Sequence, residues 1–243
     1  MQLFSLKTSL IKPKDAILPI LLCALKKSRK SLREGDLVVI SSKVVALAQN
    51  RVSHLPIEVI IRKEADVFLG GKPYSLTLKE GILIPRAGID ESNSPAGEII
   101  LWPKHSWQFA QNLRQTLAQR FKLKNLGVLI TDSTSRPLRL GVTGIAIAWA
   151  GFVGILDARG RPDLFGKKLR VTQIALADAL ASAANVLMGE AQEGIPFVLI
   201  RRAPLKFCSR TVKPKKFLPQ ECLYQSIYKP QFRKLTKIEK NGD

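Results

Sequence analysis

The sequence GVLITDSTSRPLRLGVTGIAIAWAG, residues 127–151, sets the architecture expected for the rest of the chain. Residues 128–130 are apolar and branched, which is typical of a strand buried on both faces. The chain becomes polar over residues 131–136 and apolar again after Gly141. We therefore expect two buried strands joined by a polar turn, and functional side chains often lie at such turns.

The expected polar turn offers one carboxylate, four hydroxyls and the guanidinium of Arg136. Hard oxygen ligands of this kind bind Mg²⁺ or Mn²⁺, and an arginine pairs well with phosphate. Asx and Ser/Thr turns also follow many strands without any function. Taken alone, the segment therefore favours a structural turn over a metal site.

The charge balance points to anionic partners. The chain of 243 residues carries 39 Lys and Arg against 19 Asp and Glu, a formal net charge of +20. Nucleotides, polyglutamates, nucleic acid and acidic membranes are the classes that such a charge attracts. A hydrophobic fraction of 46% excludes a globally disordered chain, and the length suits one large domain or two intimate ones.

Cysteine and histidine usage excludes several kinds of site. The three cysteines share no metal-ligand spacing, which favours a reducing cytoplasm, and the two histidines lie too far apart in sequence to indicate a zinc site. Residues 140–156 are uncharged but are broken by four glycines and are shorter than a membrane span. We expect two buried strands there, no membrane segment and no secretory signal.

The remaining chain alternates between helical and strand patterns. Asp15, Ser106 and Thr172 are expected to begin helices, and 52–69 is compatible with a short helix. The expected helices are 16–28, 43–48, 106–122 and 172–188, the expected strands 37–42 and 197–200, and the expected hairpin 74–84 with its turn at 80–81. The lysine-rich segment from Ala203 is expected to wrap the body or to be partly disordered.

Three acid-bearing loops carry a family resemblance. They are AGIDESN (87–93), ITDSTSRPLRLGVTGIAIAWAG (130–151) and DARGRPDLFGKKLRVTQIALADALASAANVLMGEAQEGIP (157–196). In this order and spacing they resemble the gamma-glutamyl ligases of deazaflavin coenzyme biosynthesis, coenzyme F-420:L-glutamate ligase, and their folate-metabolism relatives. The likeness covers residues 1–201 and is strongest over 127–196.

The resemblance implies an α+β, mixed-sheet fold of two intimately associated parts, and a homodimer. It implies a ligase-like domain at 1–201, followed by a basic extension at 202–243. The implied reaction joins L-glutamate to an anionic carboxylate acceptor as a gamma-glutamyl amide, through an acyl phosphate. The implied co-substrate is GTP, with ATP as the other candidate. The implied ions are Mg²⁺ or Mn²⁺, with K⁺ as a further candidate.

The resemblance also assigns roles to individual residues. It implies metal binding by Asp90, Asp132, Ser133 and Glu190, and we expect catalytic roles for Asp132 and Arg136, although Arg136 is equally consistent with a surface residue. Asp178 is expected to be a packed or capping side chain. The expected nucleotide-contacting residues are Thr8, Ser9, Leu10, Ile11, Ser42, Lys43, Asn93, Met188, Gly189, Glu190, Ala191, Gln192, Glu193, Gly194 and Ile195.

Departures from the family pattern leave the nucleotide and the acceptor open. Leu47 stands where the family has a nucleotide-contacting lysine, and Ser135 stands where it has a glycine. A leucine offers neither charge nor donor to a nucleotide, although Lys43 lies nearby and could supply the charge. The alternative function is a non-catalytic nucleotide- or RNA-binding protein on the same fold.

Overall fold

The computed structural model describes residues 1–94, 97–209, 213–214, 217 and 221–226. The chain forms two compact units. The first consists of Met1–His54 and Asp90–Lys213, and the second of Leu55–Ile89 and Pro214–Asp243. The division expected at residue 201 rests on sequence similarity rather than on contacts, and it stays a prediction.

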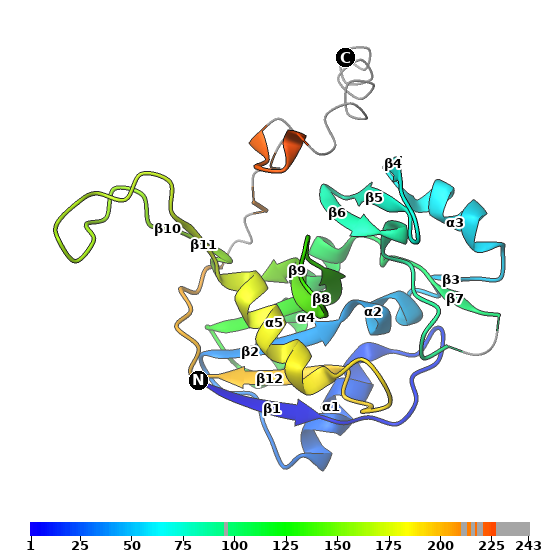
Figure 1. The fold of residues 1–243 in the computed structure, drawn as a ribbon. Coiled ribbons are helices and arrows are strands. Elements are labelled where there is room, and N and C mark those ends of the chain that lie inside the picture. Colours follow the sequence, from blue (N-terminus) through cyan, green and yellow to red (C-terminus); the bar gives the residue numbers. More distant parts are fainter. Residues whose placement is uncertain (95–96, 210–212, 215–216, 218–220, 227–243) are drawn as a thin grey trace, which may run out of the picture. The chain divides into compact units, whose positions relative to one another are not determined.

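A five-stranded mixed sheet forms the centre of the first unit (Figure 1). Only β2 and β8 are parallel, whereas every other neighbouring pair is antiparallel. The α+β class with a mixed sheet is therefore confirmed. In spatial order the strands are β1 (Gln2–Leu6), β12 (Phe197–Arg201), β2 (Asp36–Ser41), β8 (Leu126–Ser135) and β9 (Val142–Ala150).

Helix α5 (Leu176–Met188) lies across one face of this sheet, in front of the strands in Figure 1. Because successive side chains of a strand point to opposite faces, every second residue of the central strands reaches α5. The strand residues in this core are Leu37, Val39, Leu129, Trp149, Val198 and Ile200, and the helix residues are Leu176, Ala177, Leu180, Ala181, Ala184 and Met188. The sheet also contacts α1 (Ile17–Lys27) through β1 and α4 (Ser106–Phe121) through β8 and β9.

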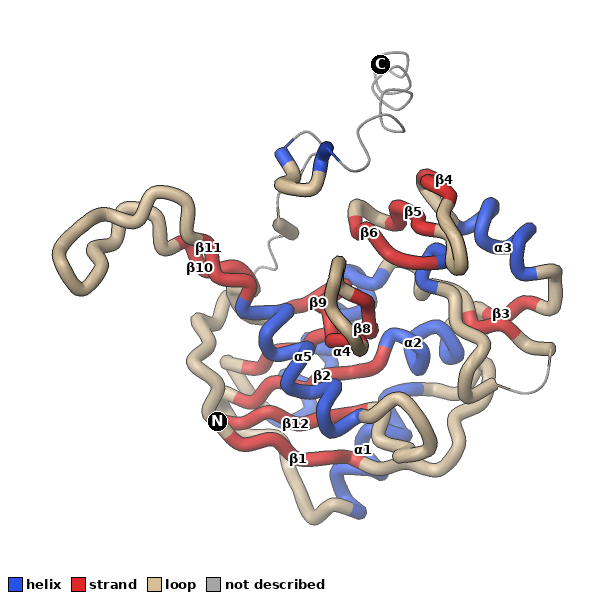
Figure 2. Tube along the Cα trace, viewed as in Figure 1, coloured by secondary structure: helices blue, strands red, loops and turns tan. Residues whose placement is uncertain are grey.

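Two short antiparallel pairs complete the first unit. Strand β3 (Val52–Ser53) pairs with β7 (Ile99–Ile100), and β10 (Ile155–Asp157) pairs with β11 (Gln173–Ala175). Figure 2 shows that β10 and β11 lead into a long loop that projects from this unit. Of the two buried strands expected over residues 140–156, β9 is largely buried, whereas β10 is not, because it pairs only with β11.

The second unit contains the expected helix and hairpin. Helix α3 (Ile57–Glu64) precedes a three-stranded sheet of β4 (Val67–Gly70), β5 (Leu76–Lys79) and β6 (Ile82–Pro85), followed by η1 (Arg86–Gly88). The hairpin turns at Glu80 and Gly81, both with positive φ, as expected. Leu69 is the buried centre of this sheet, and Cys222 of the C-terminal segment packs against it.

The expected helix starts at Asp15 and Thr172 are wrong, and Ser106 is the first helical residue rather than its cap. The Asp15 carboxylate accepts the backbone N–H of Lys12, and Ala16 precedes α1. His105, in the left-handed conformation, precedes α4. Residues 173–175 pair with β10 as β11, so α5 begins only at Leu176.

The polar segment after Ile130 is a strand and not the expected turn. Residues 131–135 continue β8 and pair with β9 through Ser135, and the turn follows at 136–141. The ladder shifts between Ile130 and Thr131, which pair with Ala148 and Ala146, so Ile147 is the extra residue of a bulge. Polar residues tolerate strand geometry here because β9 satisfies their backbone groups.

Residues 202–208 run along the body of the first unit. The N–H of Val153 donates to the carbonyl of Lys206, and that of Cys208 donates to Gly151. The first part of the basic segment therefore packs along the first unit, in agreement with the expectation that the segment wraps the body. Most of it beyond Ser209 lies outside the described residues. Within the described parts of the chain, no helix is long and apolar enough to cross a bilayer.

Candidate active site

Strand register brings the candidate residues to one end of the central sheet. Ser41 pairs with Thr131 in the parallel β2–β8 ladder, which places Asp132 level with Ser42, the first residue of α2 (Ser42–Ala48). The loop that carries Glu190 enters β12 at the same end, because the N–H of Ser41 donates to the carbonyl of Pro196. Ligand sites in α/β sheets commonly lie beyond the carboxyl ends of parallel strands.

Asp132 is a partly buried carboxylate in the extended part of β8. Its Oδ1 accepts the backbone N–H of Ser133 at 2.8 Å, and the Ser42 hydroxyl also donates to it. Burial raises the pKa of Asp132 to about 7, and the negative charge of Asp90 adds to the rise. Near neutral pH this carboxyl is therefore protonated in about half of the molecules, unless a cation takes the place of the proton.

Asp90 is held by a lysine and by its own loop. Lys43 Nζ lies 2.6 Å from Asp90 Oδ2 and also donates to the Ser92 carbonyl and hydroxyl. The N–H of Ser92 donates to Asp90 Oδ1 at 2.7 Å, and the Asp90 backbone bridges to Ile100. Burial opposes ionisation of Asp90, but Lys43 and Ser92 together hold its pKa below the usual value. Asp90 is therefore charged and paired.

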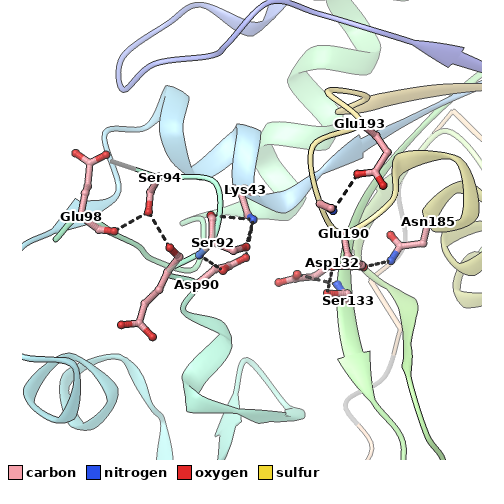
Figure 3. A network of polar contacts seen from close by, with 12 residues as sticks. Lys43, Asp90, Ser92, Ser94, Glu98, Asp132, Ser133, Asn185, Glu190 and Glu193 are labelled. Atoms are coloured by element: carbon pink, nitrogen blue, oxygen red, sulfur yellow. Dashed lines mark hydrogen bonds and ion pairs between the residues drawn. The ribbon is translucent and has the colours of Figure 1, made fainter. Parts of the chain in front are cut away.

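Glu190 is held from two elements, as Figure 3 shows. Its Oε1 accepts Asn185 Nδ2 from α5 at 2.9 Å, and its Oε2 accepts the Ser133 hydroxyl from β8 at 3.4 Å. Burial raises the pKa of Glu190, and the charge of Asp90 contributes to the rise. Burial is thus the main cause of the raised pKa values of both Asp132 and Glu190, and the nearby charge of Asp90 adds to each rise.

The loop that carries Glu190 is held in shape by the side chain of Glu193, which lies in the same loop. The Glu193 carboxylate accepts the N–H of Ala191 at 2.9 Å. A Cβ on Gly189, which has a φ of 67°, would collide with this carboxylate. The carbonyl of Gly194 accepts the N–H of Thr8 at 3.0 Å, which joins the two expected nucleotide-contacting segments 8–11 and 188–195.

The structure separates the expected site residues into two groups. Ser42, Lys43, Asp90, Asp132, Ser133 and Glu190 form a connected group through contacts or charge. Arg136 lies in the exposed turn beyond β8, and no contact of this group among the described residues involves it. Asn93 is exposed with a left-handed φ of 55°, and Leu10 is 81% exposed. Their roles stay predictions.

Leu47 occupies a different environment from the one expected of a nucleotide contact. Its side chain is 7% exposed and packs in a small core with Ala46 and Ile100, against which Ile11 also packs. The position in α2 for which the resemblance implies a lysine therefore faces the protein interior in this chain.

Asn185 and Ser92 belong to the site and were missed by sequence reasoning. Ser92 lies within the motif AGIDESN, so its proximity to Asp90 was a usable signal. Asn185 lies five residues before Glu190, and its side chain reaches Glu190 only because α5 ends between them. Asp178, expected to be a packed or capping residue, accepts the N–H of Ala146, and its packing is confirmed.

The donor chemistry fits a hard divalent cation. Asp90, Asp132, Ser133 and Glu190 offer oxygen only, which Mg²⁺ and Mn²⁺ prefer. Among the described residues, however, no three Asp, Glu, His or Cys side chains are gathered as a metal-binding group. Lys43 already compensates Asp90, and the buried Asp132 is the group that a cation would compensate.

Comparison with known proteins identifies the family. The family model described as F420-0:gamma-glutamyl ligase matches residues 5–58 and 56–202. This chain belongs to that family. The expected resemblance is therefore confirmed.

Individual relatives agree with the family match. The coenzyme F420:L-glutamate ligase of Methanocaldococcus jannaschii is 39% identical over 176 residues, 72% of this chain and 70% of the relative. That of Methanococcus maripaludis strain C7 is 36% identical over 205 residues, 84% and 82% of the two chains. That of Methanothermobacter thermautotrophicus is 31% identical over 212 residues, 78% and 84%. These relatives support a gamma-glutamyl ligase activity.

Proposed function

We propose that this protein is a nucleotide- and divalent-metal-dependent ligase that joins L-glutamate to an anionic carboxylate acceptor as a gamma-glutamyl amide. The observation that carries the proposal is the partly buried Asp132, which lies with Ser133 and Glu190 at one end of the sheet and whose pKa burial raises to about 7, with the charge of Asp90 adding to the rise. A desolvated carboxylate beside further oxygen donors suits a site that binds divalent ions and the phosphates they accompany. Family membership supports the ligase class.

The proposed chemistry has two steps. An oxygen of the acceptor carboxylate attacks the terminal phosphorus of the nucleotide, and the nucleoside diphosphate leaves. The amine of glutamate then attacks the acyl carbon, the bond to the phosphate oxygen breaks, and the nitrogen loses a proton. The acyl phosphate replaces one difficult substitution by two easier ones.

In this proposal, one set of residues binds the metal and another set binds the nucleotide. Asp90, Asp132, Ser133 and Glu190 would hold Mg²⁺ or Mn²⁺, which would offset the charge that repels the incoming carboxylate. Lys43 supplies a cation at the start of α2, next to these carboxylates. The linked segments 8–11 and 188–195 form the proposed nucleotide contacts. The net charge of +20 suits an anionic acceptor.

A homodimer is part of the proposal. The loop between β10 and β11 carries large apolar side chains that are almost fully exposed, with Leu164 at 101%, Phe165 at 96% and Val171 at 84%. Large apolar side chains along a projecting arm are expected to be covered in the functional molecule. A second copy of the chain would cover them.

Turnover assays test the proposal. Purified protein with Mg²⁺ or Mn²⁺, L-glutamate and either GTP or ATP should release phosphate once the acceptor is present. Deazaflavin coenzymes, folates and fractionated cell extracts should be screened by mass spectrometry for products that gain glutamyl units. Nucleotide binding without phosphate release under all these conditions would favour the non-catalytic nucleotide- or RNA-binding alternative.

A further inference from the structure

Helix α5 carries a stripe of polar side chains, formed by Asp178, Ser182 and Asn185. Their spacing of four and then three residues places them on one face of the helix, one turn above another. The rest of the inward surface of α5 is apolar and packs on the central sheet. Each member of the stripe makes a directed contact.

Two members of the stripe fasten α5 to β9. Asp178 Oδ1 accepts the N–H of Ala146 at 2.9 Å, next to the bulge opposite Thr131. The Ser182 hydroxyl lies 2.8 Å from both the Gly144 carbonyl and the Thr143 hydroxyl. A Cβ on Gly144 would collide with the backbone of Ala181, so helix and strand are in direct backbone contact. The axis of α5 is therefore fixed relative to β8 and β9.

Asn185 makes a different kind of contact. Its side-chain Nδ2 donates to Glu190 Oε1 at 2.9 Å (Figure 3). Its backbone carbonyl accepts the N–H of Gly189 at 2.9 Å, which is the last hydrogen bond of α5. The side chain of Asn185 therefore holds the carboxylate of the segment that leaves α5. The other Glu190 oxygen has only the longer contact of 3.4 Å with Ser133.

We propose that Asn185 is a positioning residue that orients the Glu190 carboxylate for the divalent metal, an inference that rests on the proposed function. Glu190 lies on an exposed loop, so without Asn185 its side chain would sample several rotamers. Groups that orient a ligating carboxylate typically change metal affinity by 10- to 100-fold. The fixed position of α5 makes Asn185 a rigid anchor.

Manganese binding tests this role without turnover. Mn²⁺ alone is titrated into the full chain, and the free ion is followed by electron paramagnetic resonance. Asn185→Leu keeps the size of the side chain but removes the hydrogen-bond donor. Asn185→Ala is a second variant that also lacks the donor and is expected to fold, because alanine favours helices. We expect both variants to bind Mn²⁺ about 10-fold more weakly than the wild type.

Ser182→Ala is the matched control. It removes a hydrogen bond from the same stripe, but that bond reaches β9 and not Glu190. We expect its Mn²⁺ affinity to stay within about twofold of the wild type. Weakening equal to that of the Asn185 variants would show that loosening α5 is the cause and would overturn the positioning role.

Steady-state kinetics separate this inference from the proposed function. We expect the Asn185 variants to need more metal for half-maximal rate while recovering most of kcat at saturating metal. A wild type that neither binds Mn²⁺ nor turns over would overturn both proposals. An active wild type with Asn185 variants of unchanged Mn²⁺ affinity would overturn the positioning role alone.

Discussion

Asp132 is the residue whose protonation should control the proposed metal site. With its pKa raised to about 7, the folded protein holds this proton more tightly than the unfolded chain does. Ionisation of Asp132 therefore lowers stability as pH rises from about 4 to about 7, and the cost is constant above that range. Metal binding must displace the same proton below about pH 7.

We expect Mn²⁺ affinity to rise between about pH 6 and about pH 7.5 and then to level off. Calorimetry in buffers of different ionisation enthalpy should show proton release that falls as pH rises. Asp132→Asn should abolish metal-dependent turnover and remove this pH dependence, and it should raise the Tm of the metal-free protein above about pH 7. A wild-type affinity independent of pH would contradict the prediction.

Leu47 gives a second prediction at the scale of one residue. Leu47→Lys should lower the free energy of unfolding by about 2 kcal/mol. The lysine would either bury its ammonium in the small core with Ala46 and Ile100 or open this core to reach water. Denaturant unfolding measures the loss. Leu140→Lys, at a fully exposed position, is the matched control and should change stability little. Equal stability of the two variants would contradict the prediction.

The arm between β10 and β11 is the element that tests the homodimer. Phe165→Asp is expected to shift the protein from dimer to monomer, because a charge would replace an exposed apolar side chain that the proposed second copy would bury. Light scattering after gel filtration measures the mass. Val186→Asp, at an exposed position on α5, should leave the dimer intact. A monomeric wild type, or a dimeric Phe165→Asp variant, would refute the role of the arm.

At the scale of the whole molecule, the proposed site and the last part of the chain, from Pro214, belong to different units. The site residues from Ser42 to Glu190 lie in the first unit, whereas Cys222 packs on the Leu69 core of the second. Deleting residues 209–243 should therefore lower the Tm and reduce the free energy of unfolding by on the order of 1 kcal/mol. The deletion should leave metal and nucleotide binding unchanged.

Thermal unfolding and Mn²⁺ titration of this truncation provide the measurement. Cys222→Ser in the full chain should reproduce part of the loss in Tm, because it places a polar group in the same small core. A folded truncation that no longer binds metal or nucleotide would contradict the assignment of the site to the first unit.

The sequence alone determined the elements whose signal is local. The buried strands expected at 37–42 and 197–200, the hairpin turning at Glu80 and Gly81, and the bodies of helices α1, α2, α4 and α5 follow from periodicity and turn chemistry. The family motifs indicated the acidic residues without any structure. These features depend on neighbours within a few residues, so the sequence pattern contains them.

Tertiary structure decided the features that depend on distant partners. Residues 131–135 form a strand because β9 satisfies their backbone, and α5 begins at Leu176 because 173–175 pair with β10. The raised pKa of Asp132, the burial of Leu47 and the contact of Asn185 with Glu190 likewise arise from long-range packing. Strand pairing and desolvation join residues far apart in the chain, and no local pattern specifies them.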